Sequence, residues 1–140
     1  MFSIIFENET DSIVDIELIS TIAKSFTDKE VELVLTTNEV IKEVNSSTRG
    51  IDKPTDVLSF PYEDMPHTPL GSIMISEDFV KQYSIQYNHS FQDEFTLLFI
   101  HGFLHLLGYD HEVDDGEHRK KEEELIKQYN LPSSLIVRNS

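Results

Sequence analysis

Three of the six histidines in this 140-residue chain lie within one short stretch, FIHGFLHLLGYDH, where their spacing is H-x3-H-x5-H. If residues 95–107 are helical, His101 and His105 lie one turn apart and point the same way, so both can bind one metal ion. Gly108 can then take the left-handed conformation that commonly ends a helix. The resulting reversal of the chain would bring His111 back to the same point as a third nitrogen ligand.

Three imidazoles with one open coordination position are typical of a catalytic zinc site, whereas structural zinc sites are closed by four protein ligands. The chain has no cysteine, which excludes disulfides and zinc-thiolate sites. Imidazole ligands favour zinc over nickel, iron or copper, so we expect one Zn²⁺ per chain. The alternative is that these are ordinary histidines of an amphipathic helix. A third histidine in register after the glycine favours the metal site.

The length of the chain suits a single domain, which we expect to cover residues 1–130 as a metal-dependent hydrolase domain, with 131–140 as a loosely held tail. The first residues, MFSIIFENE, lack the basic start and long apolar core of a signal peptide. No apolar run approaches the ~20 residues of a membrane span. These features predict a cytoplasmic protein.

The net charge of −15 argues against a general nucleic-acid-binding protein. Any role on RNA would need a local basic site on a surface that otherwise repels phosphates.

Hydrophobic periodicity predicts an α/β (α+β) chain with four strands and five helices. Val31, Leu33 and Leu35 alternate with their neighbours as in a strand with one buried face. The first helix would be capped by Asp11 or Ser12 and the fourth by Ser90, paired with Asp93. The predicted strands cover residues 1–7, 31–36, 57–60 and 72–75, and the predicted helices cover 12–26, 38–45, 77–87, 95–107 and 116–129.

Two further groups of polar residues have simple interpretations. The segment TRGIDKPTDVLSFP carries Arg49, Asp52, Lys53 and Asp56 before a strand, which by itself indicates a solvated loop with local ion pairs. The charges of the last helix indicate a solvated face with i,i+3 and i,i+4 pairs. The other histidines lack metal spacing and receive no role; they are His67, His89 and His118.

The segments HGFLHLLGYDH and RGIDKPTDVLSFP together resemble the two characteristic segments of the YbeY family, bacterial metal-dependent endoribonucleases of ribosomal RNA maturation. The resemblance implies a compact α/β domain with a small mixed sheet flanked by helices. It also implies that His101, His105 and His111 are the zinc ligands and that Arg49 is needed for activity. In one departure, this chain has Ser72 where the family usually has an aspartate, in Leu-Gly-Ser-Ile against Leu-Gly-Asp-Ile.

The expected function is therefore a single-strand endoribonuclease of ribosomal RNA processing and ribosome maturation, in which zinc-bound water attacks the phosphodiester. The guanidinium of Arg49 can bind two phosphoryl oxygens as negative charge develops on them. The sequence provides no clear general base. The expected partners are single-stranded ribosomal RNA and a small-subunit ribosomal protein or a ribosome-assembly GTPase, with no DNA and no membrane.

Two alternatives remain. A metal-stabilised module without enzymatic activity could dock on a ribosomal protein or a GTPase through its acidic face. Zinc peptidases with the pattern HExxHxxGxxH share the ligand spacing, but Gly102 stands where their catalytic glutamate would be. Their methionine turn follows the third ligand, whereas all three methionines here precede His111.

Overall fold

The computed structural model of the chain describes residues 3–110 and 112–132. His111 and most of the predicted tail, residues 133–140, lie outside the described residues. Within these described ranges nine elements follow one another: β1 (Ile4–Asn8), α1 (Glu17–Lys24), β2 (Val31–Thr36), α2 (Asn38–Arg49), β3 (Val57–Pro61), β4 (Gly71–Ser76), α3 (Glu77–Gln86), α4 (Phe91–Leu106) and α5 (Glu117–Tyr129).

The four strands form one mixed sheet in the order β1-β2-β4-β3. β2 pairs in parallel with both β1 and β4, whereas β3 runs antiparallel to β4 and forms one edge of the sheet. The predicted α+β class with a small mixed sheet and five helices is therefore confirmed.

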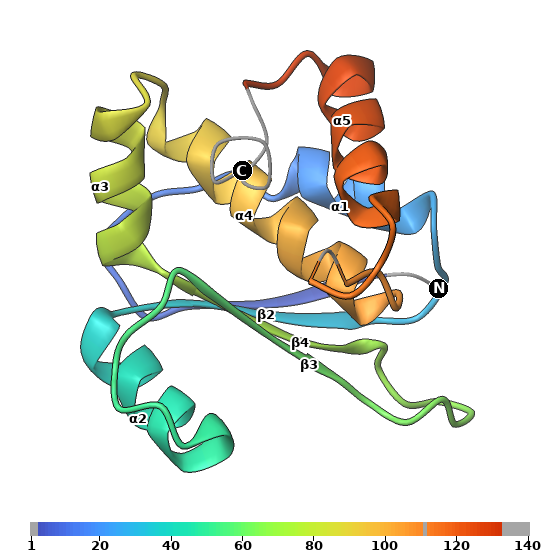
Figure 1. The fold of residues 1–140 in the computed structure, drawn as a ribbon, viewed down its shortest axis with the longest axis horizontal. Coiled ribbons are helices and arrows are strands. Elements are labelled where there is room, and N and C mark those ends of the chain that lie inside the picture. The colour runs from blue at the N-terminus through green and yellow to red at the C-terminus, as the bar shows by residue number, and fades with distance from the viewer. Residues whose placement is uncertain (1–2, 111, 133–140) are drawn as a thin grey trace.

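Helices cover the two faces of the sheet unequally (Figure 1). α4 crosses one face, with α1 and α5 packed on the same side, while α2 lies on the opposite side (Figure 1). Among the described residues, none of the helices combines the length and the apolarity that crossing a membrane requires.

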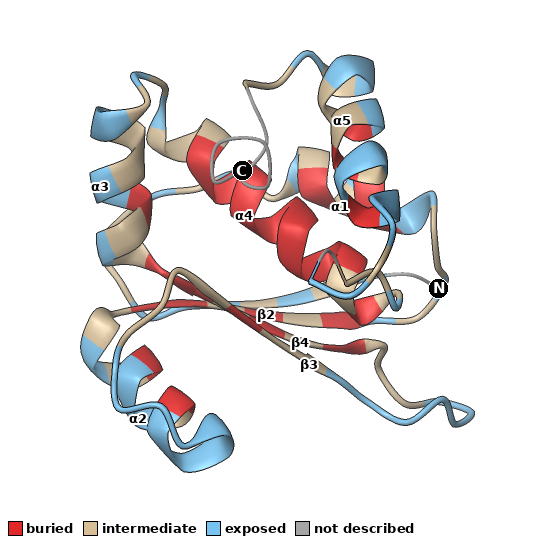
Figure 2. Cartoon of the chain, in the orientation of Figure 1, coloured by how far each residue is buried: buried red, intermediate tan, exposed pale blue. Residues whose placement is uncertain are grey.

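The core lies between α4 and the sheet, where α4 is buried along most of its length (Figure 2). Leu33 and Ile73 of the sheet and Phe99 and Phe103 of α4 are all completely buried. The rings of Phe99 and Phe103 stack with their centroids 5.6 Å apart. The predicted core-facing residues of α4 are all buried, as expected for a helix that packs directly on a sheet: Phe95, Leu98, Phe99, Gly102 and Leu106.

All nine predicted elements are present, but several of their boundaries were wrong. α1 begins only at Glu17, and neither Asp11 nor Ser12 caps it, because residues 9–16 form an irregular segment. α2 continues to Arg49 rather than ending near residue 45, and Gly50 terminates it in a left-handed conformation with φ 70°. Ser90 caps α4, accepting a hydrogen bond from the Asp93 N–H, so the predicted cap is confirmed and the helix begins at Phe91.

Candidate metal centre

The end of α4 presents two of the predicted ligands. His101 and His105 lie four residues apart in this helix, and their ring centroids are 5.0 Å apart. Gly108 has φ 103° and its N–H donates to the His105 carbonyl, while the Tyr109 N–H donates to the Leu104 carbonyl. This pair of hydrogen bonds is the Schellman arrangement that ends helices. The chain therefore reverses after His105, as the glycine predicted.

Gly102 lets α4 approach the edge of the sheet closely. A Cβ atom at this position would lie 2.8 Å from Ser59 Oγ and 3.1 Å from Val57 Cγ2, both on β3. Ser59 Oγ also donates a hydrogen bond of 3.0 Å to the Gly102 carbonyl. Because the residue after His101 faces β3 in this way, the glutamate of a zinc peptidase would not fit there.

A third histidine joins this pair from α5. One ligand atom from each of His101, His105 and His118 can be chosen so that all three lie within 4.8 Å of one another. The His118 ring stacks on that of His101, with centroids 4.7 Å apart, and lies at the same distance from that of His105. His118 had been given no role because its spacing to the others follows no ligand pattern along the chain.

Asp114 fixes the start of α5 and with it the position of His118. The Asp114 carboxylate accepts hydrogen bonds from the Gly116 and His118 N–H groups, at 2.8 and 3.0 Å. These contacts satisfy backbone donors that a helix start leaves unpaired. A short acidic loop thereby brings α5 back against α4.

Glu122 connects the two helices inside the cluster. Its Oε2 lies 2.6 Å from His101 Nδ1 and 3.1 Å from His118 Nε2. Burial alone raises the pKa of the Glu122 carboxyl, but hydrogen bonds from His101 and His118 outweigh it and hold this pKa below its ordinary value. Glu122 is therefore a buried carboxylate with two imidazole partners.

The histidine cluster opens into a cavity of about 250 Å³ that borders the edge strand β3. Arg49, at the end of α2, lines this cavity together with His101 and His105. Asp56 also lines it, and burial raises the pKa of its carboxyl, although the Val57 N–H and the nearby His101 oppose the shift. The cavity therefore combines two imidazoles and one guanidinium with the carboxyl groups of Asp56, Asp110 and Glu112.

The structure changes the expected setting of Arg49. Sequence analysis placed it in a solvated loop; it is exposed, as expected, but it is the last residue of a helix. Its neighbour in the motif, Lys53, does not line the cavity, although its carbonyl accepts a hydrogen bond from Asn45 Nδ2. On α5, Arg119 pairs with Glu123, as predicted for a solvated helix face.

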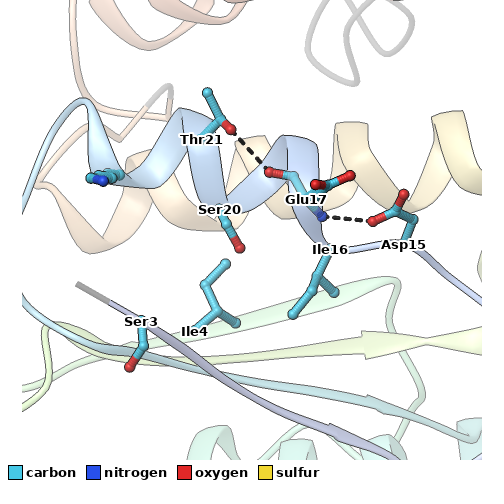
Figure 3. Close-up of a pocket in the computed structure, with 8 residues that line it drawn as sticks. Ser3, Ile4, Asp15, Ile16, Glu17, Ser20 and Thr21 are labelled. Atoms are coloured by element: carbon cyan, nitrogen blue, oxygen red, sulfur yellow. Dashed lines mark hydrogen bonds between the residues drawn. The ribbon is translucent and has the colours of Figure 1, made fainter. Parts of the chain in front are cut away.

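A larger cavity, of about 490 Å³, lies between the start of β1 and α1 (Figure 3). Its polar groups serve the helix itself: the Glu17 N–H donates to Asp15 Oδ1, and Thr21 Oγ1 donates to the Glu17 carbonyl (Figure 3). No group in it converges with the histidine cluster. We therefore assign the site by its chemistry rather than by the size of its cavity.

The residues of the cluster fit a zinc ion. The donor set is entirely imidazole nitrogen, which zinc accepts, and His101 and His118 are almost completely buried. His101 also has a carboxylate on its second nitrogen, the usual arrangement for a zinc-bound imidazole. The histidines that could hold a metal ion thus come from two helices, α4 and α5.

Ser72, the departure from the family pattern, belongs to β4, where it pairs with Phe60 and Glu32 of the adjacent strands. Its neighbour Ile73 is buried in the core with α4, so alternation along the strand directs Ser72 to the opposite face. Ser72 is also absent from the residues that line the cavity. The serine therefore leaves the histidine cluster unaltered.

Comparisons with known proteins identify one family. Residues 5–130 match the sequence profile of a family described as "Endoribonuclease YbeY". Proteins named "Endoribonuclease YbeY" from Nautilia profundicola and Sulfurimonas denitrificans are 60% and 56% identical to this chain, each over 96% of both chains. The protein of that name from Helicobacter pylori strain 26695 is 51% identical, over 94% of this chain and 95% of its own.

Among solved structures, the fold is similar to the solution structure of TM1509 from Thermotoga maritima. The TM-score is 0.57 at 31% sequence identity, over 93% of this chain and 92% of the other.

Proposed function

Because this chain belongs to the Endoribonuclease YbeY family, we propose that it is a zinc-dependent endoribonuclease that cleaves single-stranded ribosomal RNA during ribosome maturation. The observation that carries the proposal is the shared cavity, in which Arg49 lies with His101 and His105. A metal-binding cluster beside a guanidinium suits hydrolysis of a phosphodiester.

We propose His101, His105 and His111 as the ligands of one zinc ion per chain. A zinc ion held there would supply hydroxide near neutral pH, because it lowers the pKa of a water ligand to about 7. His118 lies in the same cluster, so its share in metal binding must be measured beside that of His111.

Arg49 would bind the scissile phosphate. Its guanidinium can donate to two phosphoryl oxygens at once, and this contact strengthens as negative charge develops on them. Three carboxyl groups line the cavity with Arg49 and His101, those of Asp56, Asp110 and Glu112. We favour Asp56 as the group that would accept or return a proton, because burial raises its pKa. Sequence analysis identified no such base.

The charge of the chain limits how it would find RNA. The net charge is −15, and among the described residues the cavity lining contains one basic residue, Arg49, besides its histidines. Phosphate contacts alone would therefore give weak binding. We propose that a small-subunit ribosomal protein or a ribosome-assembly GTPase provides most of the targeting, in the cytoplasm.

The test of activity is cleavage of a single-stranded RNA oligonucleotide, with zinc and after chelation. We expect chelation to abolish cleavage and Arg49→Ala to slow it by about 10²-fold, the scale of losing one donor to the developing charge. Zinc content and melting temperature of Arg49→Ala should equal those of the wild type. The matched control is Arg119→Ala, which removes an exposed arginine that pairs with Glu123 on α5 and should keep the wild-type rate.

Loss of zinc or early melting in Arg49→Ala would make this arginine structural and contradict its role. His105→Ala separates the enzyme from a module that only docks. If ribosomal RNA processing fails while the protein still associates with ribosomes, the activity resides in the metal centre. If processing survives without the metal, the docking module is the better description.

The test of the ligand set is elemental analysis. We expect about one zinc per chain in the wild type and little zinc in His101→Ala, His105→Ala and His111→Ala. His118→Ala should retain zinc with reduced affinity. If His111→Ala kept a full complement of zinc and His118→Ala held none, the third ligand would be His118 rather than His111.

A further inference from the structure

α5 buries an unusual inner face. Of its residues, only His118, Glu122 and Leu125 are buried, and they follow one another at helical spacing. Leu125 packs against Ile22 and Ile100 in a small apolar cluster. The other two are polar, at 0% and 1% exposure, and a buried carboxylate is costly unless it is paired. Glu122 on this face therefore needs partners, and its contacts are His118 on the same helix and His101 on α4.

The contact with Glu122 determines which ring nitrogen of His101 carries a hydrogen. The contact between Glu122 Oε2 and His101 Nδ1 is 2.6 Å, and an ionised carboxylate can only accept a hydrogen bond. Nδ1 of His101 must therefore carry the hydrogen. This leaves the lone pair of Nε2 for a metal ion.

We infer that Glu122 is the positioning residue of the metal centre: it orients the His101 imidazole, fixes its tautomer and holds His118 beside it. The inference rests on the proposed metal site, through His101, and is independent of the RNA substrate. α5 then contributes to metal binding even though the first two ligands belong to α4.

The chain contains a matched contact without this role. Glu94 and His89 form a buried pair at the opposite end of α4, where Glu94 Oε1 lies 2.6 Å from His89 Nε2. Glu94 is 0% exposed, so its burial and its contact distance match those of Glu122. Neither residue lines the histidine cavity or belongs to the cluster. If Glu122 only stabilised the fold, the two glutamates would behave alike.

The experiment compares Glu122→Gln with Glu94→Gln. Zinc affinity is measured by competition with a chromophoric chelator, and the tautomer of His101 by ¹⁵N NMR of the imidazoles. We expect Glu122→Gln to weaken zinc binding by about 10–100-fold, the usual effect of losing a carboxylate behind a metal-binding histidine. Glu94→Gln should keep zinc affinity within about 2-fold of the wild type, whatever its melting temperature.

Equal zinc affinity of folded Glu122→Gln and Glu94→Gln would overturn the inference. Should Glu122→Gln fail to fold, the tautomer in the wild-type protein decides: a hydrogen on Nε2 of His101 in the apo protein would refute the role of Glu122. If the proposed metal site itself is wrong, the result is different, because His101→Ala would then bind zinc with the same affinity as the wild type. The inference would be supported if Glu122→Gln bound zinc weakly and cleaved RNA slowly, and if excess zinc restored the wild-type cleavage rate.

Discussion

α4 and α5 both contribute histidines to the cluster, but different forces place them. In α4, 12 of 16 residues are buried, so the helix is fixed by apolar packing against the sheet. In α5, 3 of 13 residues are buried, and two of these are polar. α4 is thus part of the apolar core, whereas α5 is attached through the polar residues His118 and Glu122 and through Leu125 in the smaller apolar cluster.

This difference predicts how the two helices respond to perturbation. Damage to α4 should lower the stability of the whole domain, because the core is shared by all strands. Damage to α5, or loss of the metal, should act locally first. The following predictions test this contrast.

The largest effect should come from the core of α4. Phe103→Ala should lower the free energy of unfolding by about 3–5 kcal/mol, because the ring is completely buried against Phe26 and Phe99. Leu125→Ala on α5 should cost about 2 kcal/mol, the lower end for a buried leucine, because it packs in the smaller cluster. Urea unfolding measures both. Equal losses would show that α5 belongs to the same cooperative core.

Metal removal should have an intermediate effect that is concentrated in α5. At a free zinc concentration of about 100 times Kd, binding adds about 2.7 kcal/mol to the free energy of unfolding. The apo protein should stay folded, since a chain of this length has its own core. Amide hydrogen exchange should become faster in α5 and the loop before it while α4 stays protected. An apo protein unfolded at room temperature, or uniform loss of protection, would contradict the contrast.

The smallest effect should come from two carboxyl groups beside His101, the partly buried Asp56 and the buried Glu122, whose pKa values move in opposite directions. The raised pKa of Asp56 means that folding favours its protonated form, so it lowers stability once the pH exceeds its folded pKa. Asp56→Asn should therefore raise the melting temperature of the apo protein at pH 7. This gain should disappear as the pH falls through the folded pKa of Asp56.

Glu122→Gln should do the reverse. The lowered pKa of Glu122 contributes stability above its unfolded value, which is lost as the pH falls through the folded pKa. Thermal melting of both variants against pH is the measurement. A gain in stability from Glu122→Gln at pH 7 would show that the hydrogen bonds of the Glu122 carboxylate stabilise the fold by less than its burial costs.

The sequence by itself was enough to predict the parts of the site that depend on local geometry. The pair His101 and His105 follows from the pitch of one helix, and the reversal at Gly108 follows from the tolerance of glycine for positive φ. The alternation in β2 and the apolar face of α4 likewise identified the sheet and the core. Each of these signals is contained within a few adjacent residues.

Tertiary structure decided the rest. Glu122 is 21 residues from His101, and no spacing rule relates a residue on α5 to one on α4. Arg49 lines the cavity because α2 extends as far as Gly50, which ends the helix. Its position also depends on the packing of α2 on the side of the sheet opposite α4. The sequence analysis gave His118 no role for the same reason: the other histidines of the cluster belong to another helix. Contacts between elements arise from the burial of their shared faces, and this is settled only when the whole domain is packed.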